Sequence, residues 1–240
     1  MEAISLKNLA IGYKNKKLLS DISLSIPEGV LVCLIGANGV GKSTLLRTIA
    51  GFQEPLSGKF FLQGKNRDDL SNRDISRIIS VVLTQKPDVM NITVEEMVGL
   101  GRSPYTGFWG SLSVADKGIV DEALEMVGIL ALKQRLIQTL SDGERQKTMI
   151  AKALAQQTPI VLLDEPTAFL DYPSKVEMMQ MLHRLAAEKR KTILLSTHDL
   201  ELAFQLSDTL LYIGKDRLRE MKKQELADYL AHAMSNVPMP

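Results

Sequence analysis

A glycine-rich segment near the N-terminus has the residue types and the order of a phosphate-binding loop. Residues 36–44 read Gly-Ala-Asn-Gly-Val-Gly-Lys-Ser-Thr, which fits the pattern G-x-x-x-x-G-K-[ST]. Its glycines let successive backbone N–H groups turn around an anion, and a helix that starts there adds positive charge. Lys42 can reach the terminal phosphates of a nucleotide, and the Ser43 hydroxyl can bind Mg²⁺. The residues predicted to hold the nucleotide are Gly36, Asn38, Gly39, Gly41, Lys42, Ser43 and Thr44.

Two adjacent carboxylates end an apolar run later in the chain. Residues 160–165 read Ile-Val-Leu-Leu-Asp-Glu, and a buried strand would carry its last residues to the edge of a parallel sheet where ligands bind. Asp164 could hold Mg²⁺ there, and Glu165 could polarise an attacking water. Such a strand end is common on its own. Together with the phosphate loop it predicts a nucleoside triphosphatase.

A third segment combines a helix start with an unexpected glycine. Residues 140–146 read Leu-Ser-Asp-Gly-Glu-Arg-Gln, and Ser141 and Glu144 have the spacing of a capping box. A capping box does not explain Gly143, because glycine near a helix start costs about 1 kcal/mol relative to alanine. The glycine is explained if another molecule approaches the backbone closely.

This third segment resembles the signature motif of ABC ATPases, usually Leu-Ser-Gly-Gly-Gln, and other motifs follow in the order of that family. Tyr13 matches the aromatic residue that stacks on adenine, Gln85 the glutamine at the junction of two lobes, and His198 the switch histidine. Residues 168–171, Ala-Phe-Leu-Asp, match the dimer-facing loop. Taken singly, each has an ordinary structural explanation. Their shared order favours the family, and the resemblance extends from about residue 6 to residue 213.

The resemblance implies how the chain would act. It implies ATP and Mg²⁺ as cofactors and a head-to-tail homodimer, in which each ATP lies between one phosphate loop and the partner's signature residues Ser141 and Gly143. The implied catalytic residues are Glu165, His198, Lys42 and Gln85, and the implied Mg²⁺ ligands are Ser43, Gln85 and Asp164. Asp142 and Glu144 depart from the usual signature. We expect the Asp142 carboxylate to turn away from the γ-phosphate, which it would otherwise repel.

The elements that position these residues follow from the hydrophobic pattern. The run 30–35 predicts a strand buried on both faces, which leads into the phosphate loop and a helix that ends near Gly51. Capping-box spacings predict helix starts at Thr93, Ser113 and Ser141. Further strands are expected at 22–26, 59–62, 80–83, 160–163 and 192–195, and helices at 174–188 and 199–206.

This order of elements predicts an α/β fold. Its parts are a phosphate-loop NTPase core with an N-terminal antiparallel β region, and an inserted helical lobe. We expect a single ATPase domain over 1–240, in which the core covers about 1–86 and 158–240 and the lobe covers about 87–157. Near the C-terminus, residues 214–217 suggest a turn and residues 223–232 a helix.

Composition limits the location and the partners. The formal net charge is +1 and 24% of residues are charged, which gives no bulk field for a nucleic acid, so no nucleic-acid partner is expected. The single cysteine, Cys33, cannot form an internal disulfide and suits a buried strand. No apolar run reaches the roughly 20 residues of a membrane helix, and the N-terminus has no secretion signal. We therefore expect a cytoplasmic chain that reaches the inner face of the cell membrane through a protein partner.

The expected partner depends on the subfamily. Residues 99–107, Gly-Leu-Gly-Arg-Ser-Pro-Tyr-Thr-Gly, resemble importers of iron siderophores, haem and cobalamin, which implies a membrane permease and, indirectly, a substrate-binding protein. Phe108 and Trp109 could anchor the membrane subunit or pack locally. The alternatives are a soluble ABC ATPase of iron–sulfur cluster assembly, a nucleic-acid-associated ABC ATPase, and a phosphate-loop small-molecule kinase. The nucleic-acid type needs coiled coils or paired domains, and in a kinase the signature would have no purpose.

Overall fold

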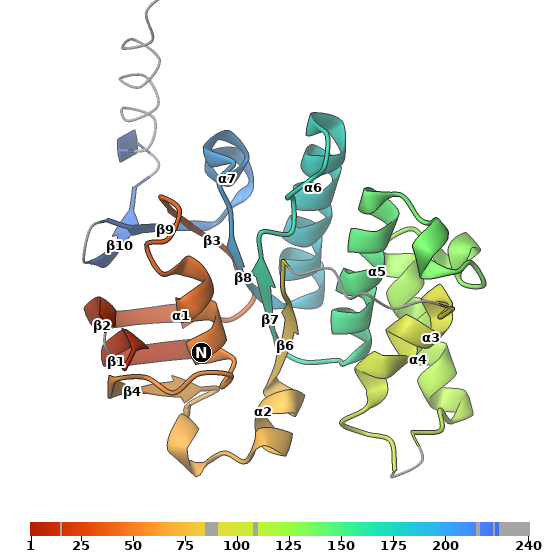
Figure 1. Ribbon diagram of the computed structural model, residues 1–240, viewed down its shortest axis with the longest axis horizontal. Helices are drawn as coiled ribbons and strands as arrows, with labels where there is room; N and C mark the ends of the chain where they lie inside the picture. Colours follow the sequence, from red (N-terminus) through yellow and green to blue (C-terminus); the bar gives the residue numbers. More distant parts are fainter. Residues whose placement is uncertain (15, 85–90, 108–109, 215–216, 223, 226–240) are drawn as a thin grey trace, which may run out of the picture.

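Alternating apolar residues at the start of the chain form an antiparallel sheet. Its order is β2-β1-β4-β5, and its strands are β1 (Glu2–Tyr13), β2 (Lys16–Pro27), β4 (Ser57–Leu62) and β5 (Lys65–Asn66). In β2, Ile22 and Ile26 are buried while Ser23 and Ser25 are exposed, as a strand with one face on the core requires. The computed structural model describes residues 1–14, 16–84, 91–107, 110–214, 217–222 and 224–225, and this sheet lies at the left of Figure 1.

A second sheet carries the strands that lead to the site. Its order is β10-β9-β3-β8-β7-β6, and its strands are β3 (Leu31–Gly36), β6 (Ile79–Val82), β7 (Ile160–Asp164), β8 (Thr192–Ser196), β9 (Thr209–Ile213) and β10 (Leu218–Met221). The strands from β9 to β6 are parallel, and β10 pairs antiparallel at the edge. Because parallel strands end at the same edge, the segments after β3, β7 and β8 come together.

Both faces of this sheet are covered. Val32, Leu34 and Leu162 pack in a core that includes α1 (Lys42–Ile49) and the antiparallel sheet. Cys33 and Leu163 point to the opposite core, which includes α6 (Tyr172–Lys189) and α7 (Leu200–Leu206). Figure 1 shows α1 on one side of β7 and β8 and α6 on the other. The predictions of doubly buried strands and of a buried Cys33 are confirmed.

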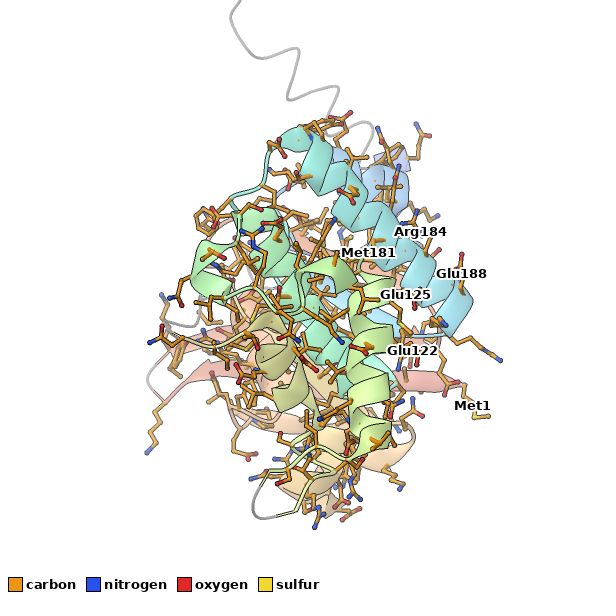
Figure 2. The ribbon with its side chains drawn as sticks, turned by 90° about the vertical axis from the view of Figure 1, so that its right-hand side faces the viewer. Met1, Glu122, Glu125, Met181, Arg184 and Glu188 are labelled. Atoms are coloured by element: carbon orange, nitrogen blue, oxygen red, sulfur yellow. The ribbon has the colours of Figure 1, made fainter. Side chains whose placement is uncertain are left out.

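The middle of the chain is helical, as predicted. Its helices are α3 (Val94–Gly99), α4 (Val114–Met126) and α5 (Asp142–Ala155), and short 3₁₀ turns lie between them at Leu100–Arg102, Leu130–Leu132 and Ile137–Thr139. A further 3₁₀ turn (Arg67–Asp69) and α2 (Asn72–Ile78) precede β6. Figure 2 shows α4 beside α6, and Lys189 Nζ of α6 lies 3.9 Å from Glu122 Oε1 of α4.

Local signals set the helix ends. The capping boxes predicted at Thr93, Ser113 and Ser141 are all formed. Another at Ser71, which begins α2, was not predicted. Helix α1 ends at Ile49 with Ala50 as its C-cap residue, and Gly51 follows with φ of 77°, so the predicted end of this helix near Gly51 is confirmed. Hydrogen bonds between residues close in sequence therefore mark these helix ends.

The segment 99–107 has a packing role at its centre. A Cβ at Gly101 would lie 2.2 Å from the carbonyl oxygen of Lys152 in α5. Arg102 is 5% exposed, and its guanidinium donates to Asp116 Oδ1 (2.9 Å) and to the Ala155 carbonyl (2.8 Å). Hydrogen bonds from Ser113, and then the one from Arg102, lower the pKa of Asp116 to about 2. This part of the segment ties a loop to α4 and α5.

Several predictions concern residues that the structure does not describe. Phe108, Trp109, Gln85 and most of the expected helix at 223–232 lie outside the described residues. At the expected turn the Gly214 N–H donates to the Arg217 carbonyl (2.9 Å). Across the described part of the chain, no helix has the length and apolar character needed to cross a membrane.

Candidate active site

The phosphate loop leaves β3 at Gly36 and enters α1 at Lys42. Gly39 and Gly41 have φ of 76° and 111°, in the left-handed region that favours glycine. A Cβ at Gly39 would meet nothing within 4 Å, so the backbone conformation and not crowding requires glycine there. No side chain caps the start of α1. Its first N–H groups are therefore available to an anion.

Lys42 lies at the bottom of this loop. It is 6% exposed, and its Nζ donates to the carbonyl oxygens of Gly36 (2.9 Å) and Ala37 (3.1 Å). Burial lowers the pKa of the Lys42 ammonium, while the charges of Glu165 and Asp164 act in the opposite direction. Phosphate oxygens at the loop would add negative charge and stabilise the charged ammonium further.

Ser43 and Asp164 meet where Mg²⁺ would be held. Ser43 Oγ donates to Asp164 Oδ1 (2.9 Å), and Ser196 Oγ donates to the same oxygen (2.8 Å). Asp164 is 4% exposed, and Thr84 Oγ1 donates to its carbonyl oxygen (2.9 Å). A hydroxyl and a carboxylate supply the hard oxygen ligands that Mg²⁺ prefers. The donor set therefore fits the ion.

Glu165 and His198 are in direct contact. His198 Nε2 lies 2.6 Å from Glu165 Oε1 and 3.4 Å from Lys42 Nζ. The Glu165 N–H donates to Ser196 Oγ (2.9 Å), and its φ is 52°. The ends of β7 and β8 thus place a carboxylate and an imidazole beside the buried lysine. This arrangement can orient a water and hold a phosphate oxygen.

Tyr13 completes the same hollow. The lining residues include Tyr13, Lys16, Leu18, Asn38, Gly39, Gly41, Lys42, Ser43, Thr44 and Glu165. Tyr13 is 53% exposed, so part of its ring is accessible to a planar group. The structure therefore brings together the phosphate loop, the acidic strand end and the predicted adenine-stacking residue. Gln85, predicted as a catalytic residue and Mg²⁺ ligand, lies outside the described residues.

Comparison with known families decides the class of this site. A family model described as ABC transporter matches residues 19–168, which is more than half of the chain. This chain belongs to the ABC transporter family. ATP hydrolysis is the activity of its cassettes, and the chain is an ATPase.

Two relatives and one solved structure agree with this family. An uncharacterised ABC transporter ATP-binding protein of Methanocaldococcus jannaschii is 42% identical over 212 residues, or 88% of this chain and 73% of the relative. The iron(3+)-hydroxamate import ATP-binding protein FhuC of Bacillus subtilis is 39% identical over 216 residues, or 90% and 80%. A bacterial ABC transporter cassette solved as a dimer has a TM-score of 0.77 at 28% identity, covering 91% of this chain and 99% of that one. The predicted fold class is confirmed.

The signature residues of this cassette lie in a different hollow. Ser141 is the N-cap of α5, where its N–H donates to Glu144 Oε2 (2.8 Å). The lining of this hollow includes Ser141, Gly143, Leu170, Ser174 and Glu177. None of the described residues that line it also lines the hollow that contains Tyr13 and Lys42. Figure 1 shows α1 and α5 separated, with β7 and β8 between them. One cassette therefore keeps these two hollows apart.

Packing against the described residues does not require glycine at position 143. Among those residues, a Cβ there would meet only Leu170 Cδ2, at 3.8 Å, which is an ordinary contact. Asp142 is exposed in the first turn of α5, where an acid is favourable for the helix dipole. The orientation of its carboxylate stays a prediction.

Sequence reasoning missed Ser196 in this cassette. Its hydroxyl donates to Asp164 and accepts from the Glu165 N–H, and Ser196 is fully buried. It therefore orients both acids. The only sequence signal is its place at the end of the strand before His198, and a single serine there is too common to be diagnostic.

Proposed function

We propose that this cassette powers a membrane importer for iron siderophores, haem or cobalamin, and that it lies in the cytoplasm against the inner face of the cell membrane. The convergence of Lys42, Asp164, Glu165 and His198 at one sheet edge carries the ATP-hydrolysing part. The cargo class is supported by the relative named for iron(3+)-hydroxamate import. The segment 99–107 supports it only in part, because Gly101 and Arg102 serve packing.

The proposed chemistry assigns a role to each side chain in the hollow. The adenine stacks on Tyr13, and loop N–H groups with Lys42 hold the phosphates. Ser43 and Asp164, with Gln85 as the further proposed ligand, would hold Mg²⁺, which would supply positive charge against the phosphates. Glu165 polarises the attacking water, and His198 holds the γ-phosphate and that water in place.

The proposed assembly is a head-to-tail homodimer. Ser141 and Gly143 lie in a hollow separate from Lys42, so one copy supplies them to the ATP of the other. The room at Gly143 supports this arrangement, because a side chain is absent where its own chain would tolerate one. Close approach of a phosphate to the α5 N-terminus would explain the glycine.

A groove beside α2 is the proposed docking site for the permease. We assign about 1–86 and 158–240 to the core and 87–157 to the helical lobe, and the groove is lined from both parts. Its lining includes Gly51, Phe52, Ile75, Leu100, Ser103 and Gln156. Phe52 is 63% and Leu100 50% exposed, so apolar surface is available to a helix of the membrane subunit. A substrate-binding protein would act indirectly, through that subunit.

Reconstitution with candidate permeases tests this function. The cassette is co-expressed with each permease, purified in lipid, and supplied with binding proteins loaded with a ferric siderophore, haem or cobalamin. We expect one loaded binding protein to stimulate ATP hydrolysis. Hydrolysis without co-purification with any permease, and without stimulation by any loaded binding protein, would instead favour a soluble ABC ATPase.

Variants at Phe52 test the docking groove in the same assay. Phe52→Asp should abolish stimulation by placing a charge on an apolar contact, whereas Phe52→Leu should retain it. Equal stimulation of both variants would place the permease elsewhere on the cassette.

A further inference from the structure

Asp199 has an unusual use for a residue at a helix start. It occupies the N-cap position of α7 but makes no capping hydrogen bond, although an aspartate cap typically stabilises a helix by about 1 kcal/mol. Its Oδ2 instead accepts from Thr167 Oγ1 (3.0 Å), and its Oδ1 accepts from Lys175 Nζ (3.0 Å). The Asp199 carboxylate therefore connects the start of α7 to the loop after β7 and to α6.

These contacts and the contact between Glu165 and His198 connect the same two segments, the one after β7 and the one after β8. Asp199 directly follows His198, and Thr167 lies two residues after Glu165. We call Thr167, Asp199 and Lys175 the outer bridge. It joins the same two loops that the 2.6 Å contact between His198 Nε2 and Glu165 Oε1 joins. Two links between the same loops restrict sliding or rotation of one against the other.

The outer bridge is partly shielded from solvent. Thr167 is 3% exposed, and the side chains of Lys175 and Asp199 are only 25% and 30% exposed. The Asp199 N–H also donates to Thr197 Oγ1 (3.0 Å), and Thr197 is 2% exposed. A hydrogen bond to a charged group in such surroundings is stronger than a neutral one at the surface.

We propose that the outer bridge positions His198 against Glu165 during ATP hydrolysis. Among the hydrogen bonds and ion pairs of the described residues, none joins the side chains of the outer bridge to the phosphate loop or to Asp164, so the bridge would act through His198. This inference rests on the proposed roles of Glu165 and His198. Lys175 lies near the start of α6, beyond the loop 168–171, in which Phe169 and Asp171 are exposed, so the bridge holds that loop at both ends.

Steady-state hydrolysis by the full chain with ATP and Mg²⁺ tests the proposal. Thr167→Val preserves shape and removes the hydroxyl, and we expect kcat to fall about tenfold because a small misplacement of reacting groups is costly. The KM for ATP and the affinity for nucleotide should not change. Thr167→Ser keeps the hydroxyl and should restore kcat. Asp199→Asn should lower kcat, whereas Asp121→Asn, which breaks a lysine–aspartate pair of 3.1 Å in the helical segment, should not.

A double variant separates positioning from general damage. In a His198→Ala background, measured by single turnover, Thr167→Val should cause no further loss, because the bridge acts only through that histidine. An equal additional loss would overturn the proposal, and so would wild-type kcat in Thr167→Val. If His198→Ala itself kept the wild-type rate, the proposed role of His198 would be wrong. The proposed positioning role of the outer bridge would then be wrong as well.

Histidine NMR gives a readout that does not depend on turnover. The chain has 3 histidines, so the ring signal of His198 is identified by its absence in His198→Ala. Thr167→Val should move this signal and leave the others in place. An unmoved His198 signal would show that the ring stays in position without the bridge.

Discussion

Glu165 is held in a backbone conformation that residues other than glycine rarely adopt. Its φ is 52°, and such conformations cost of order 1–3 kcal/mol. The Glu165 N–H donates to the Ser196 hydroxyl, and the Glu165 carboxylate contacts the His198 ring. Contacts on both sides therefore maintain the strained geometry. In the proposed mechanism, a carboxylate held in this way would not need to reorganise when the water attacks the γ-phosphate.

Replacement of the Glu165 carboxylate separates ATP hydrolysis from ATP binding. In Glu165→Gln the side chain keeps its shape but cannot take a proton from water, so we expect kcat to fall by about 100-fold or more. ATP affinity should be retained, because the phosphate contacts come from the loop and Lys42. Glu188→Gln, on an exposed part of α6 (Figure 2), is the matched control. Steady hydrolysis near the wild-type rate would exclude the role assigned to Glu165.

At this scale the sequence predicts residues that belong to contiguous motifs. Lys42 and Ser43 sit in one pattern, and Asp164 and Glu165 end one strand, so spacing alone identifies them. Ser196 could not be found in this way. It reaches the acids only because β7 pairs with β8 in a register that places Asp164 opposite Ser196. Strand register of this kind depends on long-range packing.

Among the helices, some features depend on residues close in sequence and others on residues far apart in sequence. The capping boxes at Thr93, Ser113 and Ser141 depend on residues three positions apart and were predictable. The helix expected at 199–206 is present as α7 (Leu200–Leu206) with Asp199 at its N-cap position, but the Asp199 carboxylate accepts from Thr167 and Lys175 and does not cap the helix. No local pattern shows that a competent cap will be taken by another segment.

Gly101 tests whether the segment 99–107 is kept for packing. Gly101→Ala would force a Cβ against the Lys152 carbonyl at 2.2 Å, so we expect the free energy of unfolding to fall by about 1–3 kcal/mol. Gly107→Ala is the control, because a Cβ there would meet nothing within 4 Å. Its change should stay within about 0.5 kcal/mol. Urea unfolding measures both, and equal stability of the two variants would contradict a packing role.

The whole molecule presents two partial sites on one chain. Figure 1 shows the start of α1 and the start of α5 separated by the parallel sheet. The motifs themselves were readable from the sequence, whereas their separation follows from strand order and helix packing. Pairing of one chain's Lys42 with another's Ser141 is a property of two molecules, and no pattern within one sequence displays it.

Cross-linking tests the head-to-tail arrangement. Asn38 and Asp142 are exposed, and the only native cysteine, Cys33, is fully buried. An equimolar mixture of Asn38→Cys and Asp142→Cys should form covalent dimers with a short bifunctional thiol reagent when ATP is present. Each variant alone should stay monomeric on a denaturing gel. Dimers from either single variant, or none from the mixture, would require a different arrangement of the two copies.

Under the proposed assembly, a chain that keeps its half-sites apart cannot consume ATP while it is alone. The rate per molecule then depends on how often two copies meet, so it should fall steeply on dilution. A permease that docks two copies raises their effective concentration and therefore their rate of ATP hydrolysis. Cassettes made in excess of their permease would hydrolyse ATP slowly at low concentration. The abundance of the membrane complex would then set how fast the cell consumes ATP through this protein.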